Sequence, residues 1–206
     1  MAAMDSARYS LAYRLVRRFL NLLFRTIFKV TIVGSERMPA TGPVIVVSRH
    51  ESLLDPLLLG VFLPRPIHFL YSADLTNYPG VGAFLRFAQG IKINKRSPDR
   101  AALRAALDLL GQNLPVGIFP EGGIGPAQEI GSFTGGAAWL ARHSGAPLLP
   151  VWLSTRAALS SKGYPRLGGK IVVVLGEPYR ISVRERDLAG VSTELRRKVA
   201  ELEQLV

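Results

Sequence analysis

The chain contains no cysteine among its 206 residues. A disulfide framework, a thiol nucleophile and a cysteine metal site are therefore excluded. Acidic residues are also sparse, 15 against 26 lysines and arginines, and the formal net charge is +11. So basic a chain favours polyanionic partners, such as nucleic acid, an anionic membrane surface or a phosphorylated substrate. Arginine outnumbers lysine, and this preference favours contacts to phosphate groups.

The sequence also lacks a long uninterrupted apolar run, because residues 11–30 are apolar but broken by cations. A helix that crossed a bilayer would have to bury several of these charges at once. On a helical wheel the polar residues instead share one arc, opposite the apolar ones; they are Arg14, Arg17, Arg18, Asn21, Arg25 and Lys29. The pattern predicts a basic amphipathic helix over residues 1–30, docked on a membrane surface through residues 8–30. The alternative is a helix packed on the protein's own core, with a solvated basic face.

The remaining residues, 31–206, are enough for one domain with a real core. Strand-like and helix-like segments alternate, which predicts an α/β domain with a mostly parallel mixed sheet flanked by helices. The expected strands are residues 30–33, 44–47, 67–71, 91–93, 116–119, 147–153 and 170–175. The expected helices are an apolar one ending near residue 62, then residues 79–87, 99–110, 133–144 and 192–205.

Two expected strand ends carry residues suited to chemistry, and parallel sheets gather their active sites at such ends. His50 follows strand 44–47, and Glu121 follows strand 116–119. Asp55 comes about one turn after His50, so it can hold the imidazole in one tautomer. The other ring nitrogen is then able to take a proton from a hydroxyl group. The alternative is an ordinary polar contact between the two side chains.

Two further segments are candidates for binding an anion. Residues 117–126 run from a strand into a glycine-rich turn, whose free amides can hold a phosphate or an oxyanion. Residues 90–96 bring three cations together before a helix, and Arg96 is the candidate for a two-point contact to phosphate. The alternatives are an ordinary turn, in which Glu121 bonds the loop backbone, and a solvated run of charge.

These segments, in this order, resemble the sequence blocks of the lysophospholipid acyltransferase family, which includes the 1-acylglycerol-3-phosphate acyltransferases. The block N-H-x-S-x-x-D resembles residues 49–55, and an apolar block ending in arginine resembles residues 90–96. The block F-P-E-G-T-R resembles residues 119–124, and an apolar-proline-valine strand resembles residues 149–151. The resemblance extends over residues 30–180, and four blocks in order make it specific.

The resemblance implies a catalytic His50 as general base and Asp55 as the residue that orients it. Acyl-CoA or acyl-carrier protein would donate the acyl group to a lysophospholipid, with no cofactor and no metal. The implied acceptor site consists of Arg49, Ser52, Lys95, Arg96, Glu121, Gly122 and Gly123. The expected location is peripheral or monotopic, on the cytoplasmic face of the cell membrane, with no nucleic acid as partner.

Two departures from the family pattern affect the expected acceptor. Gly123 and Ile124 stand where the family has threonine and arginine, and Arg49 stands where it has asparagine. We therefore expect Arg49, with Lys95 and Arg96, to hold the acceptor phosphate, or else an acceptor of another kind such as an aminolipid. A non-catalytic membrane protein on the same fold is one alternative. A nucleic-acid-binding protein is another, although no module of that kind is present.

Overall fold

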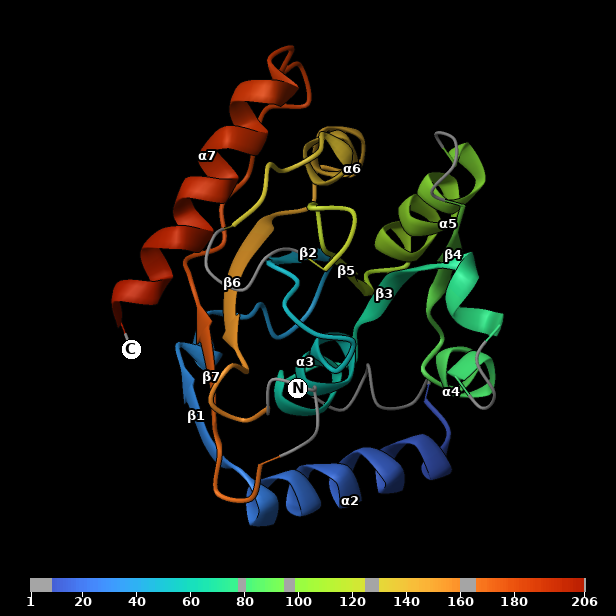
Figure 1. Ribbon diagram of the computed structural model, residues 1–206. Coiled ribbons are helices and arrows are strands. Elements are labelled where there is room, and N and C mark those ends of the chain that lie inside the picture. The colour runs from blue at the N-terminus through green and yellow to red at the C-terminus, as the bar shows by residue number, and fades with distance from the viewer. Residues whose placement is uncertain (1–8, 78–80, 95–98, 125–129, 160–165, 206) are drawn as a thin grey trace.

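The computed structural model describes residues 9–77, 81–94, 99–124, 130–159 and 166–205. Seven strands form one sheet in the order β1-β7-β6-β2-β5-β3-β4 (Figure 1). They are β1 (Lys29–Val33), β2 (Val44–Ser48), β3 (His68–Ser72), β4 (Ile91–Ile93), β5 (Pro115–Ile118), β6 (Leu148–Ser154) and β7 (Lys170–Leu175). All neighbouring strands are parallel except β6 and β7. The predicted α/β fold with a mostly parallel mixed sheet is confirmed.

Helices cover both faces of this sheet (Figure 1). One face carries α2 (Leu11–Ile27) and α3 (Asp55–Phe62), and the other carries α5 (Arg100–Gly111), α6 (Gly136–Ser144) and α7 (Leu188–Glu201). A short helix, α4 (Val81–Phe87), lies beside the edge formed by β3 and β4. Single 3₁₀ turns occupy Ser35–Arg37, Ala73–Asn77 and Leu202–Leu205.

Strand β2 lies at the centre of the sheet and is buried on both faces. Val44 and Val46 pack in one hydrophobic cluster with Leu59 of α3. Ile45 and Val47 pack in a second cluster, with residues of α5 and α6. Burial on both faces explains why the strand is a continuous apolar run rather than an alternating one. The carboxyl end of β2, where His50 follows, is therefore held in the middle of the fold.

Helices α6 and α7 begin three or four residues away from where the sequence predicts. The backbone N–H and the hydroxyl of Thr134 both donate to the carbonyl oxygen of Pro120, each at 2.9 Å. This contact keeps the chain out of a helix until Gly136, three residues later than expected. Helix α7 begins four residues early, because Asp187 caps it by accepting the N–H of Gly190 at 2.7 Å.

The inner side of α2 packs on the protein through polar as well as apolar contacts. Leu20, Phe24 and Ile27 pack against the cluster that contains α3. Arg17 donates from Nε to the carbonyl oxygen of Gly60 at 2.8 Å, and from Nη2 to that of Leu63. Asn21 donates to the carbonyl of Val61 at 3.3 Å. The predicted polar arc is thus not uniformly solvated, since these two members of it turn towards the end of α3.

The outer side of α2 exposes a stripe of large apolar side chains. Their exposed fractions run from 54% to 66%, and they are Leu11, Leu15, Phe19 and Leu22. The exposed cations Arg14, Arg18 and Arg25 lie next to this stripe on the helical wheel. Packing on the core and an apolar outer face therefore coexist on one helix. In the part of the chain that the structure describes, no helix is both long and apolar enough to span a bilayer.

Candidate active site

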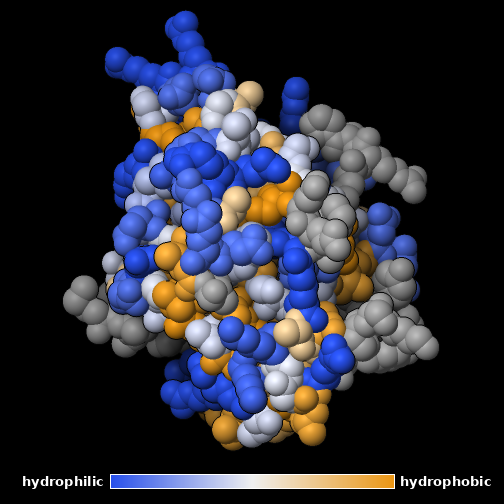
Figure 2. All heavy atoms as spheres, turned by 60° about the vertical axis from the view of Figure 1, so that its left-hand side comes forward, coloured by the Kyte–Doolittle hydropathy of each residue, from blue (hydrophilic) through white to orange (hydrophobic). Residues whose placement is uncertain are grey.

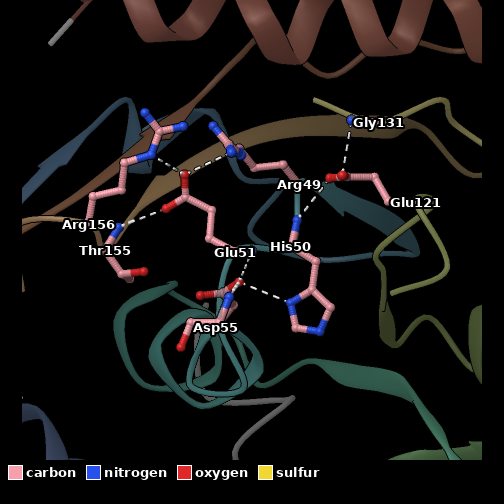
Figure 3. Close-up of polar contacts among 9 residues, drawn as sticks. Arg49, His50, Glu51, Asp55, Glu121, Gly131, Thr155 and Arg156 are labelled. Atoms are coloured by element: carbon pink, nitrogen blue, oxygen red, sulfur yellow. Dashed lines mark hydrogen bonds and ion pairs between the residues drawn. The ribbon is translucent and has the colours of Figure 1, made fainter. Parts of the chain in front are cut away.

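His50 and Asp55 lie in contact at the carboxyl end of β2 (Figure 3). The imidazole Nδ1 is 3.0 Å from Oδ2 of Asp55, the first residue of α3. The same oxygen accepts the backbone N–H groups of Glu51 at 2.6 Å and Ser52 at 2.8 Å. Because an ionised carboxylate only accepts hydrogen bonds, Nδ1 of His50 is the donor in this contact. Nε2 then carries a lone pair that is available to take a proton.

A stack of aromatic rings fixes the imidazole from one side. The His50 and Phe119 ring centroids are 4.3 Å apart at an interplanar angle of 19°, and Phe69 stacks on Phe119 at 5.3 Å. Gly117 makes room for this stack, because a Cβ atom there would lie 2.3 Å from the Phe69 ring. A role for Phe69 and Gly117 in supporting His50 was not predicted from the sequence. The one available signal was a glycine inside a buried strand, which often marks a close approach.

His50 opens onto an apolar cavity of about 520 Å³ between α2, α3, α4 and β3. This volume is within the range of sites for small organic ligands. Apolar side chains from all four elements line it, among them Val16, Leu20, Leu57, Phe69, Leu85 and Phe87. The proton-accepting histidine therefore faces a space that suits a hydrocarbon chain.

Glu51 forms a buried ion cluster on the other side of the segment (Figure 3). Its Oε1 lies 2.9 Å from Nη2 of Arg49 and 3.2 Å from Nε of Arg156. Its Oε2 accepts the N–H of Thr155 at 3.2 Å. Burial raises the pKa of the Glu51 carboxyl, although the Thr155 hydrogen bond and the two arginines act in the opposite direction. The cluster ties the His50 segment to the end of β6.

The predicted role of Arg49 as a phosphate ligand does not fit this geometry. Its side chain is 2% exposed. The guanidinium lies over the Trp152 ring, 4.6 Å from the centroid, and pairs with Glu51. Neighbouring residues of an extended segment point to opposite sides, so Arg49 turns away when His50 turns to the cavity. The expected compensation for the arginine missing at residue 124 is therefore not available from Arg49.

Glu121 joins two loops rather than facing the cavity as a free carboxylate. Its Oε1 accepts the backbone N–H of His50 at 3.0 Å, and its Oε2 accepts that of Gly131 at 3.1 Å. Hydrogen bonding to the loop backbone was the alternative role considered for Glu121. Ser52 has a local contact too, since its hydroxyl oxygen accepts the N–H of Leu54 at 3.1 Å.

The glycine turn that follows Glu121 is not closely packed by other residues that the structure describes. Gly122 has a φ of +74°, a left-handed conformation that favours glycine. A methyl group on Gly122 or Gly123 would meet no other atom of the described residues within 4 Å. Ile124 is 49% exposed beside them. Lys95 and Arg96, the other predicted acceptor ligands, lie outside the described residues.

Residues 29–154 match the family model described as Acyltransferase. The chain belongs to the acyltransferase family. This match covers more than half of the 206 residues and includes His50, Asp55 and the glycine turn. The family membership and the acyltransferase class of enzyme that the four sequence blocks indicated are both confirmed.

Individual relatives of this acyltransferase agree with the family match. The 1-acyl-sn-glycerol-3-phosphate acyltransferase of Bacillus subtilis is 26% identical over 181 residues, which cover 84% of this chain and 88% of the relative. A protein of that name from Chlamydomonas reinhardtii is 30% identical over 158 residues, covering 73% of this chain and 47% of the relative. The crystal structure of the 1-acyl-sn-glycerophosphate (LPA) acyltransferase PlsC from Thermotoga maritima matches with a TM-score of 0.73. That match has 27% sequence identity and covers 93% of this chain and 79% of the other.

Proposed function

We propose that this acyltransferase moves a fatty acyl group from a thioester to a hydroxyl of 1-acylglycerol-3-phosphate or a related lysophospholipid, in phospholipid biosynthesis. The donor is acyl-CoA or acyl-carrier protein. One observation carries the proposal: the His50–Asp55 pair opens directly onto an apolar cavity. A base at the mouth of such a cavity suits a substrate with a hydroxyl at one end and a hydrocarbon chain at the other. The names of the relatives supply the acceptor class.

The proposed reaction needs one proton acceptor and no covalent acyl-enzyme. His50 Nε2 removes the proton of the acceptor hydroxyl while its oxygen attacks the thioester carbonyl carbon. The carbon–sulfur bond then breaks, and the imidazolium gives its proton to the leaving thiolate. Asp55, at 3.0 Å from Nδ1, holds the ring in the required tautomer and stabilises the imidazolium between these steps.

The membrane role of α2 is part of the proposal. The apolar stripe of α2 would enter the lipid interface, and each neighbouring arginine would add roughly 1 kcal/mol of attraction to an anionic surface. Val16 and Leu20 of the same helix line the cavity, so substrate chains would reach His50 directly from the interface. The protein would act as a peripheral or monotopic enzyme on the cytoplasmic face of the cell membrane.

The acceptor headgroup needs ligands other than Arg49. Since Arg49 is buried, we propose that Lys95, Arg96 and the turn amides of Gly122 and Gly123 bind the acceptor phosphate. The exposed Ile124 replaces a family cation there, which favours an acceptor that carries less negative charge than lysophosphatidic acid, such as an aminolipid, as the second candidate.

The test is acyl transfer from labelled acyl-CoA and labelled acyl-carrier protein to a panel of lyso acceptors. His50→Ala should lower the rate about 10²- to 10⁴-fold, the usual contribution of a general base. His143→Ala is the matched control, because this histidine is exposed on α6 and stacks on Trp139 away from the cavity. Transfer by His50→Ala at the wild-type rate would contradict the base assignment. A folded wild type that acylates no acceptor would contradict the proposed function.

A further inference from the structure

An arginine of the C-terminal helix contacts the loop that supports the active site. Arg196 of α7 donates from Nη2 to the carbonyl oxygen of Ile130 at 2.8 Å. Its Nε donates to the carbonyls of Ile130 and Gly131, each at 3.1 Å. A guanidinium is a rigid planar fork of donors, so two contacts on adjacent carbonyls fix both position and direction. Arg196 therefore adds polar contacts to the apolar packing of Ile130 against Val199 of α7.

The peptide group between Ile130 and Gly131 lies between two opposite charges. Its carbonyl oxygen accepts from the Arg196 guanidinium, and its N–H donates to Oε2 of Glu121 at 3.1 Å. The negative carbonyl end of the peptide dipole faces the Arg196 guanidinium, and the positive N–H end faces the Glu121 carboxylate, so both contacts are favourable. Hydrogen bonds in such a chain polarise one another and become stronger together. Loss of Arg196 should thus weaken the hydrogen bond that Glu121 accepts from Gly131, although no direct contact joins the Arg196 and Glu121 side chains.

Glu121 passes this constraint to the catalytic segment. Its second oxygen, Oε1, accepts the backbone N–H of His50 at 3.0 Å. Glycine at residue 131 permits the contact at the other end, because a Cβ atom there would lie only 3.0 Å from Oε2. Figure 3 shows Gly131, Glu121 and His50 joined in this order by two hydrogen bonds. Asp55 orients the His50 ring, whereas this chain of contacts holds the His50 main chain.

We propose that Arg196 is a positioning residue for acyl transfer, acting through the Ile130–Gly131 peptide group and Glu121 on the backbone of His50. The inference rests on the proposed function, since it assumes that His50 is the base. A displacement of about 1 Å at a catalytic group can lower a rate about 10²-fold. Loss of Arg196 should therefore reduce kcat while leaving KM unchanged, because no substrate contact is removed.

Arg197 provides a matched control on the same helix. Both arginines are exposed, but Arg197 pairs with Glu194 and Glu201 and not with the Ile130 loop. Arg196→Ala should lower kcat about 10- to 100-fold, and Arg197→Ala should stay within about twofold of the wild type. Arg196→Lys keeps the charge but loses the fork, so an intermediate kcat is expected. Equal kcat for Arg196→Ala and the wild type would overturn the proposal.

A double-mutant cycle with Glu121→Gln tests whether Arg196 acts through Glu121. Each single change should lower kcat, and the double variant should be only about two- to threefold slower than Glu121→Gln alone. Independent losses that multiply would show that Arg196 supports the fold in general and would overturn the route through Glu121. If Arg196→Ala fails to fold, Arg196→Lys replaces it in the same cycle.

Amide hydrogen exchange by NMR separates this inference from the proposed function. Arg196→Ala should speed the exchange of the Gly131 and His50 amides at least about tenfold over the wild type, through easier local opening. Arg197→Ala should leave both unchanged. A wild type without acyl transfer would reject the proposed function but would still give this readout. Unchanged exchange at both amides in Arg196→Ala would overturn the proposal whatever the activity.

Discussion

The first and last α-helices that the structure describes, α2 and α7, contact segments next to the candidate active site in the same way but face their surroundings differently. Each uses an arginine as a fork on backbone carbonyl groups: Arg17 of α2 on the end of α3, and Arg196 of α7 on the Ile130 loop. Outward, however, α2 exposes an apolar stripe, whereas α7 exposes ion pairs. Figure 2 shows hydrophilic side chains over much of the face along α7, and hydrophobic ones at its lower end, where α2 lies.

The outer face of α7 carries ion pairs between side chains one turn apart, as is typical of a solvent-exposed helix. Arg197 Nη2 lies 2.6 Å from Glu194 Oε1, and Lys198 approaches the same oxygen at 3.5 Å. The hydrogen bonds and charge of Arg197 lower the pKa of Glu194 to about 2, so this carboxylate stays charged at any physiological pH. A contiguous apolar patch bordered by cations is instead typical of a membrane-binding surface. On our proposals, the inner contacts of each helix would position the site, and the outer face of α2 would place the enzyme at a membrane surface.

The largest effect is expected when the outer face of α2 is made charged, as the outer face of α7 is. Phe19→Glu with Leu22→Glu removes two exposed apolar side chains, each worth about 1.5–3 kcal/mol when buried. Binding to vesicles of phosphatidylglycerol should therefore fall at least about 10²-fold in a sedimentation assay. Thr193→Glu, on the exposed side of α7, is the control and should leave binding unchanged. Equal binding of both variants would mean that α2 is not the docking surface.

The inner contacts of α2 give the second test. Arg17→Met leaves the carbonyls of Gly60 and Leu63 without their donors, at a cost of about 1–3 kcal/mol. Thermal unfolding should then shift down by roughly 2–12 °C. Because α2 lines the cavity through Val16 and Leu20, the preference among acyl chains of different length should change as well.

Arg14→Met is the matched control for that test, since Arg14 is an exposed cation one turn earlier on α2. It should leave both the unfolding temperature and the chain preference close to those of the wild type. If Arg14→Met and Arg17→Met behave alike, the effect comes from the charge of α2, and its carbonyl contacts are not what hold the cavity wall.

The sequence predicted what depends on local pattern. The β2 run is continuously apolar because both faces are buried, and Asp55 reaches His50 because it lies one turn away. Arg49 was placed wrongly because its position in the sequence block was given more weight than the alternation of side chains. Its neighbour Glu51 was the clue, since a buried arginine requires a partner of opposite charge.

Contacts between distant segments left little signal in the sequence, such as the glycine at residue 117 inside a buried strand. Phe69 supports His50 only because Gly117, on the next strand, leaves room for its ring. Arg196 reaches the Ile130 loop because α7 packs beside α6. In the sequence, Arg196 and Arg197 are equivalent members of a charged helix. Both are exposed in the structure, and only the packing of α7 decides which of them reaches the loop carbonyls.

The smallest expected effect is a pH dependence at the start of α2. His68 is buried, with Nδ1 2.8 Å from the Gln89 carbonyl oxygen and Nε2 2.7 Å from the hydroxyl of Tyr9, which precedes α2. Burial lowers the pKa of His68 below its usual 6.5. The unfolded chain therefore binds this proton more readily than the folded one. The His68 contribution is complete above about pH 6.5 and is lost as the pH falls below it.

Thermal unfolding between about pH 8 and about pH 5 measures this contribution. His68→Gln keeps a donor for Gln89 and an acceptor for Tyr9 but does not titrate, so its unfolding temperature should fall less on acidification than that of the wild type. His143→Gln, at the exposed histidine of α6, should keep the wild-type slope. Glu194 of α7, with a pKa of about 2, does not titrate in this range. Acid should thus loosen the Tyr9 end of α2 before it affects α7, and identical slopes for His68→Gln and the wild type would refute this.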